Sequence, residues 1–451
     1  MDPRRSARGR EIFLAVIALV AVSLWTSAAI AEQSAPSASN GDPATGLADS
    51  AALRASVFGT PPQDIAPLPA SVPLQEINIA LPWARPVPQV FWFDRRLRVW
   101  FSAQDKPAPL AIVISGVGDG GNTAMLSVLR AVLYGAGYHV LTMPSPTFPG
   151  FIVAASSTGV AGDLIQDGHD LYAAMQEIIS HLPKHAAITD VDIVGYSLGG
   201  ANAAIVKSIA DAGGKLRIHR AVMINPPVSL FDSVGRLDRL FAVSIGSGDA
   251  GIERLYRRMY AKLANLFRAT DQVQVDESDM LSSVAAVLKT DADFSAAIAL
   301  SFRIALMNMF LAGDLYAGTG VVVDPAHPPH VGDSLEEIAR ILRTKPFAEY
   351  FAEVFAPYYL AHRPNSTVQS LKADNRLEII AGALQSNPDY FGQTNSDDVI
   401  LDRADLAWLR STLGGRLAVY DHGGHLGNLG DRSQVSDMLD MLAGRWGAAK
   451  Q

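Results

Sequence analysis

Short apolar runs recur along the chain from residue 76, and amphipathic stretches separate them. Almost continuous apolar runs are typical of strands buried on both faces of a parallel sheet, whereas apolar residues three and four positions apart predict helices. Strands that alternate with helices predict a parallel sheet covered by helices. We expect strands at 76–81, 90–102, 110–116, 138–144, 191–197 and 219–227, and helices at 123–135, 163–181 and 203–213.

This alternation stops after residue 227. From 229 to 372 the patterns are helical, and strand character returns only at 376–382 and 415–421, before a closing helix at 433–446. We therefore predict an α/β core formed by residues 76–228 and 375–451, with a helical cap inserted over residues 229–374.

The most apolar segment of the expected cap is Ser295–Ala312, which carries Arg303 near its middle. A charge at the centre of a bilayer costs about 2.5–3.5 kcal/mol on insertion scales. We therefore expect a buried cap helix here, and membrane contact by the cap is the less favoured alternative.

The N-terminus has the pattern of an export signal. Basic residues precede the apolar run Ile12–Leu24, and a small-residue stretch ends in Ala29-Ile30-Ala31. An uncleaved anchor is the alternative, but the run is short for a hydrocarbon layer of about 30 Å. We predict a signal peptide at 1–31, a flexible leader rich in Pro, Ala and Ser at 32–75, and a periplasmic or secreted protein.

Composition narrows the classes of function. The 451 residues are 49% hydrophobic and 18% charged, so the chain has ample material for a buried core. The net charge of −8 argues against a nucleic-acid partner. Because cysteine is absent, disulfides and thiolate metal sites are excluded. The sequence does not indicate an oligomeric state.

The stretch DIVGYSLGGANAA at 192–204 surrounds one serine with residues that have almost no side chain. Gly195-Tyr196-Ser197-Leu198-Gly199 matches G-x-S-x-G, and it follows an apolar strand and opens a helix, as a nucleophile elbow requires. Glycines allow the tight turn, and the helix N-terminus favours developing negative charge. We therefore interpret Ser197 as a nucleophile.

A serine hydroxyl needs a base within hydrogen-bond reach, and that base needs a partner to orient it. The segment YDHGGHLGNLG at 420–430 contains two histidines. We expect His425 to be the base, because flanking glycines leave its ring room to approach the serine. His422 is expected to be structural.

The orienting acid should lie between the serine and the histidine in sequence. We favour Asp398 in TNSDDVIL (394–401), because it directly precedes an apolar run. Asp397 is the first alternative and Asp389 a more distant one. The interpretation of these acids as caps of a turn or helix also stays open.

An oxyanion requires preorganised N–H donors. We assign the backbone N–H groups of Leu198 and of Val117, which lies in the glycine-rich loop ISGVGDGGNT (114–123), with Gly118 as a neighbour that could replace Val117. The loop lacks the P-loop and dinucleotide-binding patterns, so no nucleotide cofactor is expected. The histidine pairs 327/330 and 422/425 could be imagined as a shared zinc site, but they have no nearby carboxylate pattern of a zinc site and no cysteines, so no metal is expected.

Taken together, these motifs resemble those of the α/β-hydrolase superfamily. The residues concerned are SGVGDGG at 115–121, GYSLGG at 195–200, NSDDVIL at 395–401 and GGHLGN at 423–428. The resemblance implies the α/β-hydrolase fold, in which a mostly parallel eight-stranded sheet carries helices on both faces and a cap follows the sixth strand. Two departures stand out. About fifteen residues separate the expected strand at 376–382 from Asp398, and Ser115-Gly116 replaces the common His-Gly.

From this resemblance we expect a serine hydrolase, and the N-terminal pattern implies that it is exported. It would cleave a carboxylic ester, a thioester or a lipid-like acyl substrate through an acyl-enzyme. A peptidase on the same fold is one alternative. A second is a binding protein that keeps the fold with an idle site, because a fold by itself does not determine function.

Overall fold

The computed structural model describes residues 49–83, 85–183, 186–245, 250–258 and 288–447. The expected signal peptide at 1–31 lies outside the described residues.

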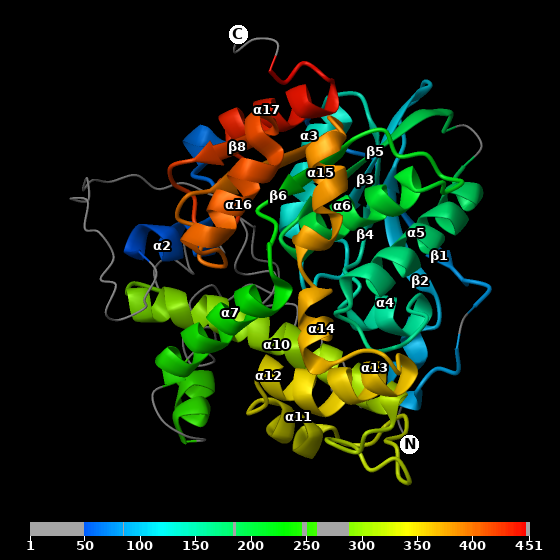
Figure 1. Cartoon of the computed structure of the whole chain (residues 1–451), viewed down its shortest axis with the longest axis vertical. Coiled ribbons are helices and arrows are strands. Elements are labelled where there is room, and N and C mark those ends of the chain that lie inside the picture. The colour runs from blue at the N-terminus through cyan, green and yellow to red at the C-terminus, as the bar shows by residue number, and fades with distance from the viewer. Residues whose placement is uncertain (1–48, 84, 184–185, 246–249, 259–287, 448–451) are drawn as a thin grey trace.

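One eight-stranded sheet organises the molecule (Figure 1), in the order β1-β2-β4-β3-β5-β6-β7-β8. Strand β2 pairs antiparallel with both β1 and β4, and every other pairing is parallel. The mostly parallel eight-stranded sheet predicted from the sequence is therefore confirmed. The strands are β1 (Gln75–Ile79), β2 (Leu97–Ser102), β3 (Ala108–Ile114), β4 (His139–Met143), β5 (Ile188–Tyr196), β6 (Ala221–Ile224), β7 (Tyr390–Asn395) and β8 (Leu417–Tyr420).

Helices cover both faces of the sheet, and alternate strand residues face each layer. In β3, Ala111 and Val113 pack with α3 (Ala124–Gly135) and α17 (Arg432–Leu442). The intervening residues Leu110, Ile112 and Ile114 pack on the opposite face. Successive side chains of a strand point to opposite faces, so a strand covered on both sides needs apolar residues throughout. The opposite layer consists of α5 (Leu164–His181), α6 (Leu198–Asp211) and α16 (Arg403–Leu413).

The prediction of a strand at 376–382 is wrong. These residues form the 3₁₀ helix η4 (Leu377–Ile380) and the start of helix α15 (Ala381–Ser386). Leu377 and Ile380 are buried, whereas Ile379 is exposed, so burial follows a helical and not an alternating spacing. The strand at this place in the sheet is β7, which pairs with β6 and β8. Its sequence YFGQTN has a polar second half, although all of it is buried, so it lacks the apolar run that marks the other core strands.

The expected strand at 90–102 is only half correct. Residues Gln89–Asp94 form the 3₁₀ helix η2, and β2 begins at Leu97. A run of aromatic residues misled the prediction, because aromatic side chains favour strands yet also pack well from a short helix.

The described residues between β6 and β7 form mainly helices, and Figure 1 shows α7 and α10 to α14 gathered at one end of the sheet. Aromatic rings form much of their interior. Phe231 lies 4.6 Å from Phe351 and 6.1 Å from Phe355 between ring centroids, and Phe355 lies 4.5 Å from Tyr359. The described segments are α7 (Leu230–Ile245), α10 (Asp291–Ala317), α11 (Glu336–Leu342), α12 (Phe347–Tyr350), the π-helix η3 (Phe351–Phe355), α13 (Ala356–His362) and α14 (Val368–Ala373).

Helix α10 is the central helix of this insertion. By length and composition it is the one described helix that could cross a membrane, yet 67% of its most apolar window is buried inside the structure. Arg303 is buried within it, donates to Asp238 of α7 at 3.1 Å and lies 4.1 Å from the ring centroid of Phe241. The paired arginine is typical of a core helix in a folded cap.

The described part of the expected flexible leader is packed against the body. Residues 49–75 include helix α2 (Ser50–Phe58), whose Leu53 and Val57 are buried among residues of α7 and α10. Asp49 caps the helix by accepting a hydrogen bond from Ala51 N. The sequence analysis did not predict this short helix, because the segment around it is rich in proline.

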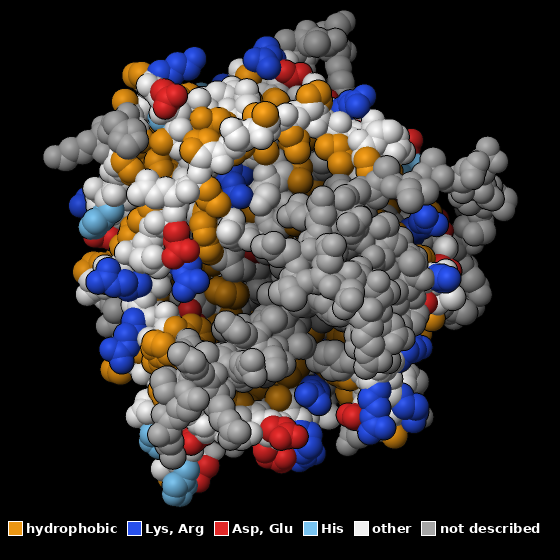
Figure 2. All heavy atoms as spheres, turned by 180° about the vertical axis from the view of Figure 1, so that it is seen from behind, with side chains coloured by type: hydrophobic (Ala, Val, Ile, Leu, Met, Phe, Trp, Pro, Cys, Tyr) orange, Lys and Arg blue, Asp and Glu red, His pale blue; other side chains and the backbone are white. Residues whose placement is uncertain are grey.

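The face of the molecule seen in Figure 2 carries side chains of both charges. On the face shown in Figure 2, Lys and Arg side chains alternate with Asp and Glu side chains around the rim, without a broad patch of either sign.

We predict that Asp238→Ala destabilises the protein by about 3–5 kcal/mol, because it leaves the Arg303 guanidinium buried without its partner. The midpoint of urea-induced unfolding measures the change. Glu337→Ala removes an exposed ion pair with Arg340 and should leave the midpoint unchanged. Equal midpoints for Asp238→Ala and the wild type would contradict the role given to this pair.

Candidate active site

Ser197 occupies the sharp turn between β5 and α6. Its φ of 54° and ψ of −129° are rare for a residue with a side chain, and such a conformation costs of order 1–3 kcal/mol. The surrounding structure enforces it: Ser197 N donates to Ile224 O of the neighbouring strand β6 at 2.8 Å. The strained backbone lifts the hydroxyl out of the turn, as in a nucleophile elbow.

The glycines of the motif are required by space. A Cβ atom at Gly195 would lie 1.9 Å from Gly199 O, and one at Gly199 would lie 2.2 Å from Ile114 O at the end of β3. Both obstacles are backbone atoms that cannot move aside. A Cβ atom at Gly116 would lie 3.2 Å from Ser197 Cβ. The turn between β5 and α6 thus approaches the end of β3 so closely that only glycine fits at these positions.

His425 lies within hydrogen-bond reach of the serine. Its Nε2 is 2.9 Å from Ser197 Oγ, and its Nδ1 is 3.0 and 3.1 Å from the two carboxylate oxygens of Asp398. The histidine is in the loop after β8, whereas His422 of the same loop is exposed. The structure therefore brings together Ser197, His425 and Asp398, the three residues that the sequence analysis selected.

Asp398 is buried and has several donors around it. It accepts hydrogen bonds from Asn225 Nδ2 at 2.8 Å and from Ile400 N at 3.1 Å. These two hydrogen bonds fix the orientation of the Asp398 carboxylate relative to the imidazole of His425. The acid follows β7 by three residues, since β7 ends at Asn395, so the long gap expected from the sequence does not exist.

Asp397, the alternative acid, has a different position. Its carboxylate accepts from Gly423 N at 3.2 Å and Gly424 N at 2.8 Å, and burial raises its pKa above the ordinary value. It therefore shapes the histidine loop through the backbone. Asp389 lies 3.8 Å from Arg220 in a separate ion pair.

The sequence analysis selected the backbone N–H groups of Val117 and Leu198 as donors to an oxyanion. Gly116–Asp119 form a tight turn in which Asp119 N donates to Gly116 O, and Gly118 has the positive φ that such a turn needs. Gly118 N donates to Thr147 Oγ1 at 2.9 Å, so the alternative donor is already engaged. Within the described residues, neither the N–H of Val117 nor that of Leu198 donates a hydrogen bond. Leu198 is also the first residue of α6, where the helix dipole favours an anion.

Three further residues of the site were missed by the sequence analysis. Asn225, which contacts Asp398, has a φ of 47° directly after β6. An asparagine that ends a buried strand was a usable signal, because asparagine tolerates this conformation better than most residues. Asp119 and Tyr196 are the other two.

Asp119 joins the oxyanion turn to the elbow. Its buried carboxylate accepts hydrogen bonds from Tyr196 OH, from Thr123 Oγ1 at 2.7 Å and from Gly121 N at 2.8 Å. Burial raises the pKa of Asp119, and the bond from Tyr196 lowers it again in part. Since Tyr196 precedes Ser197 directly, this bond fixes the turn relative to the nucleophile.

Among the described residues, no group of three or more His, Asp or Glu side chains is arranged to hold a metal ion.

Comparisons with known proteins gave matches only among solved structures: no family model and no curated protein matches the chain. An esterase of Pyrococcus furiosus aligns with a TM-score of 0.40 and 10% identity, over 86% of this chain and 98% of the esterase. Carboxyl esterase 2 of the mycorrhizal fungus Tuber melanosporum gives a TM-score of 0.39 and 14% identity, over 85% and 90%. The thioesterase domain from the curacin biosynthetic pathway gives 0.36 and 11%, over 82% and 99%.

The class of the protein follows from its own topology. An eight-stranded, mostly parallel sheet with helices on both faces, a serine on the turn after β5 and helices inserted between β6 and β7 define the α/β-hydrolase fold.

We predict that Tyr196→Phe destabilises the protein by about 1–3 kcal/mol near neutral pH, because the buried Asp119 carboxylate loses a donor. The pKa of Asp119 in the folded state then rises further above its unfolded value. A carboxyl whose pKa is raised by folding stabilises the protein while it is protonated, and this stabilisation is lost as the pH rises. The difference in the free energy of unfolding between Tyr196→Phe and the wild type should therefore grow from pH 4 to pH 8.

Tyr172→Phe is the matched control, measured by urea unfolding at both pH values. Tyr172 OH is also largely buried but bonds to the backbone of Leu216, which does not titrate. Its deficit should not change with pH. An equal pH dependence in both variants would contradict the assignment to Asp119.

Proposed function

We propose that this chain is an exported serine hydrolase that cleaves carboxylic esters or thioesters with an apolar acyl group. The single observation that carries the proposal is the continuous hydrogen-bonded path from Ser197 Oγ through His425 to Asp398. A serine becomes a useful nucleophile when a base takes its proton and an acid orients that base.

The proposed reaction has two halves. Ser197 Oγ attacks the carbonyl carbon while His425 Nε2 takes the hydroxyl proton, and the N–H groups of Val117 and Leu198 stabilise the oxyanion. The tetrahedral intermediate then expels the alcohol or thiol, which receives that proton from His425, and an acyl-serine remains. Water attacks this ester, again with His425 as base, and releases the acid and free Ser197.

The preference for an apolar acyl group is inferred from helix α10. A Cβ atom at Gly118 in the oxyanion turn would lie 2.3 Å from Ala305 Cβ of α10, so this helix packs directly on the turn. Ser295–Ala312 of α10 is almost wholly apolar. A substrate carbonyl in the oxyanion site would therefore have apolar surface beside it, which favours a hydrocarbon chain over a charged group.

Export remains part of the proposal and is supported by the N-terminal sequence pattern. Cleavage after Ala31 would leave helix α2 in the mature protein, because α2 begins at Ser50. N-terminal sequencing of the protein recovered from a periplasmic extract should start at Glu32, and an intact Met1 would contradict cleavage.

We expect a fluorophosphonate probe to label the purified protein at Ser197. Labelling should vanish in Ser197→Ala and fall by at least about 10³-fold in rate in His425→Ala. Asp398→Asn should lower kcat for a p-nitrophenyl ester by about 10⁴-fold, because the imidazole loses the partner that fixes its tautomer. An intact wild-type protein that does not react with the probe would refute the proposal.

Asp397→Asn is the control for the acid. Its amide oxygen can still accept from one of the two glycine N–H groups, so we expect less than about a tenfold loss of kcat. A larger loss than in Asp398→Asn would reverse the assignment.

A panel of p-nitrophenyl esters of increasing chain length, an acyl thioester and a peptide separates esterase from thioesterase and peptidase activity.

A further inference from the structure

Helix α2 contacts the loop that carries His425, although it precedes the sheet in sequence and belongs to none of the motifs of the fold. Ser56 Oγ accepts a hydrogen bond from His425 N at 2.7 Å, and it donates to Ala52 O one turn earlier at 2.7 Å. The donation to Ala52 fixes the direction of the hydroxyl, so its lone pair faces the histidine backbone. Ser56 is 4% exposed, and water therefore does not easily replace it.

The fit between α2 and this loop is close. A Cβ atom at Gly424 would lie 2.1 Å from Ala52 O, and one at Gly427 would lie 2.4 Å from Ala55 O. Glycine thus appears on both sides of His425 because the backbone of α2 occupies the space. The same glycines make the loop intrinsically flexible, since glycine has the largest conformational freedom of any residue. An external contact is needed to hold the histidine still.

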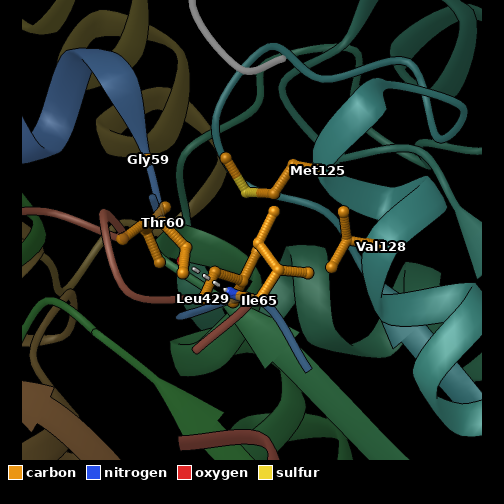
Figure 3. Close-up of a pocket in the computed structure, with 8 residues that line it drawn as sticks. Gly59, Thr60, Ile65, Met125, Val128 and Leu429 are labelled. Carbon is orange, nitrogen blue, oxygen red and sulfur yellow. Dashed lines mark hydrogen bonds between the residues drawn. The ribbon is translucent and has the colours of Figure 1, made fainter. Parts of the chain in front are cut away.

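Thr60, which follows α2, makes hydrogen bonds to the C-terminal end of the loop that carries His425. Thr60 Oγ1 donates to Gly427 O at 3.1 Å and accepts from Gly430 N at 3.1 Å. Thr60 lines a small pocket of about 30 Å³. Met125 and Val128 of α3 line the same pocket (Figure 3).

The far side of α2 is fixed by the cap. Ser50 Oγ donates to Asp291 Oδ1 of α10 at 2.6 Å, and the rings of Phe58 and Phe294 meet edge to face at 5.4 Å. Leu53 and Val57 are buried against α7 and α10. Helix α2 is thus clamped between α10, which also touches the oxyanion turn, and the histidine loop.

We propose that Ser56 is a positioning residue for the proposed hydrolysis, acting through His425. The inference rests on the proposed function, because it concerns the same reaction. The imidazole must stay within hydrogen-bond reach of Ser197 while it accepts and returns a proton in each half of the reaction. Its ring is attached to a glycine-rich loop, and the bond from His425 N to Ser56 fixes the backbone at the point of attachment. Misplacement of a reacting group by about 1 Å can reduce a rate by about 100-fold.

The test compares Ser56→Ala with the wild type on a p-nitrophenyl ester, in the full-length mature chain. We expect kcat to fall by about 10- to 100-fold while KM stays within twofold, since the substrate does not touch Ser56. Ser244→Ala is the matched control: Ser244 makes the same kind of backbone bond, to Leu240 O at 2.8 Å, on helix α7. It should retain the wild-type kcat.

A second arm separates positioning from a general loss of structure. In a His425→Ala background, adding Ser56→Ala should leave the residual rate unchanged, because the residue through which Ser56 acts is gone. A merely structural role would lower the residual rate by a similar factor in both backgrounds. If Ser56→Ala does not fold, Ser56→Cys replaces it, because a thiol fills the same space but is a weak acceptor.

The inference is overturned if Ser56→Ala, or Ser56→Cys in its place, keeps the wild-type kcat, or if the loss is the same without His425. Failure of the proposed function is a separate outcome, because the wild-type protein would then not react with the fluorophosphonate probe at all.

Discussion

The site depends on how closely helix α6 approaches the ends of strands β3 and β5. At Gly195 and Gly199 the backbone of one element lies against backbone carbonyls of the next, and no side chain fits between them. This approach accompanies the strained backbone of Ser197, which opens helix α6. The Gly116–Asp119 turn is joined to the Ser197 turn by the hydrogen bond from Tyr196 OH to Asp119, so the two turns are held in place together.

Much of this arrangement could be predicted from the sequence, because the elements around Ser197 have strong local signals. Strands β3, β4 and β5 are apolar runs, and the spacing of G-x-S-x-G specifies a turn that few folds contain. The prediction failed at β7, where Gln393, Thr394 and Asn395 are polar but buried. Polar residues are tolerated in a sheet core when neighbouring elements offer hydrogen bonds, as Gln434 O does for Gln393 Nε2 and Gly424 O for Asn395 Nδ2. Periodicity does not record such tertiary partners.

The missed strand also explains one of the two departures from the α/β-hydrolase pattern, the long gap expected before Asp398. With β7 ending at Asn395, the acid Asp398 stands directly after its strand, as the α/β-hydrolase pattern implies. Helix α2 was missed for a different reason. It is short and lies in a proline-rich segment, and its burial comes from contacts with residues hundreds of positions away. Local propensity is a weak guide to such a helix, because tertiary packing supplies most of its stability.

The contact between Ser56 and His425 joins residues 369 positions apart, near the two ends of the folded chain. Contacts of such long sequence separation form late, because the intervening chain must first be ordered. During synthesis the helix that holds the histidine emerges first and the histidine loop emerges last. A growing chain therefore contains Ser197 well before it contains Asp398 and His425, and the hydrogen-bonded path between these three residues needs segments from both sides of the helical insertion. The contact from Ser56 to His425 further ties that path to the helix that precedes the sheet.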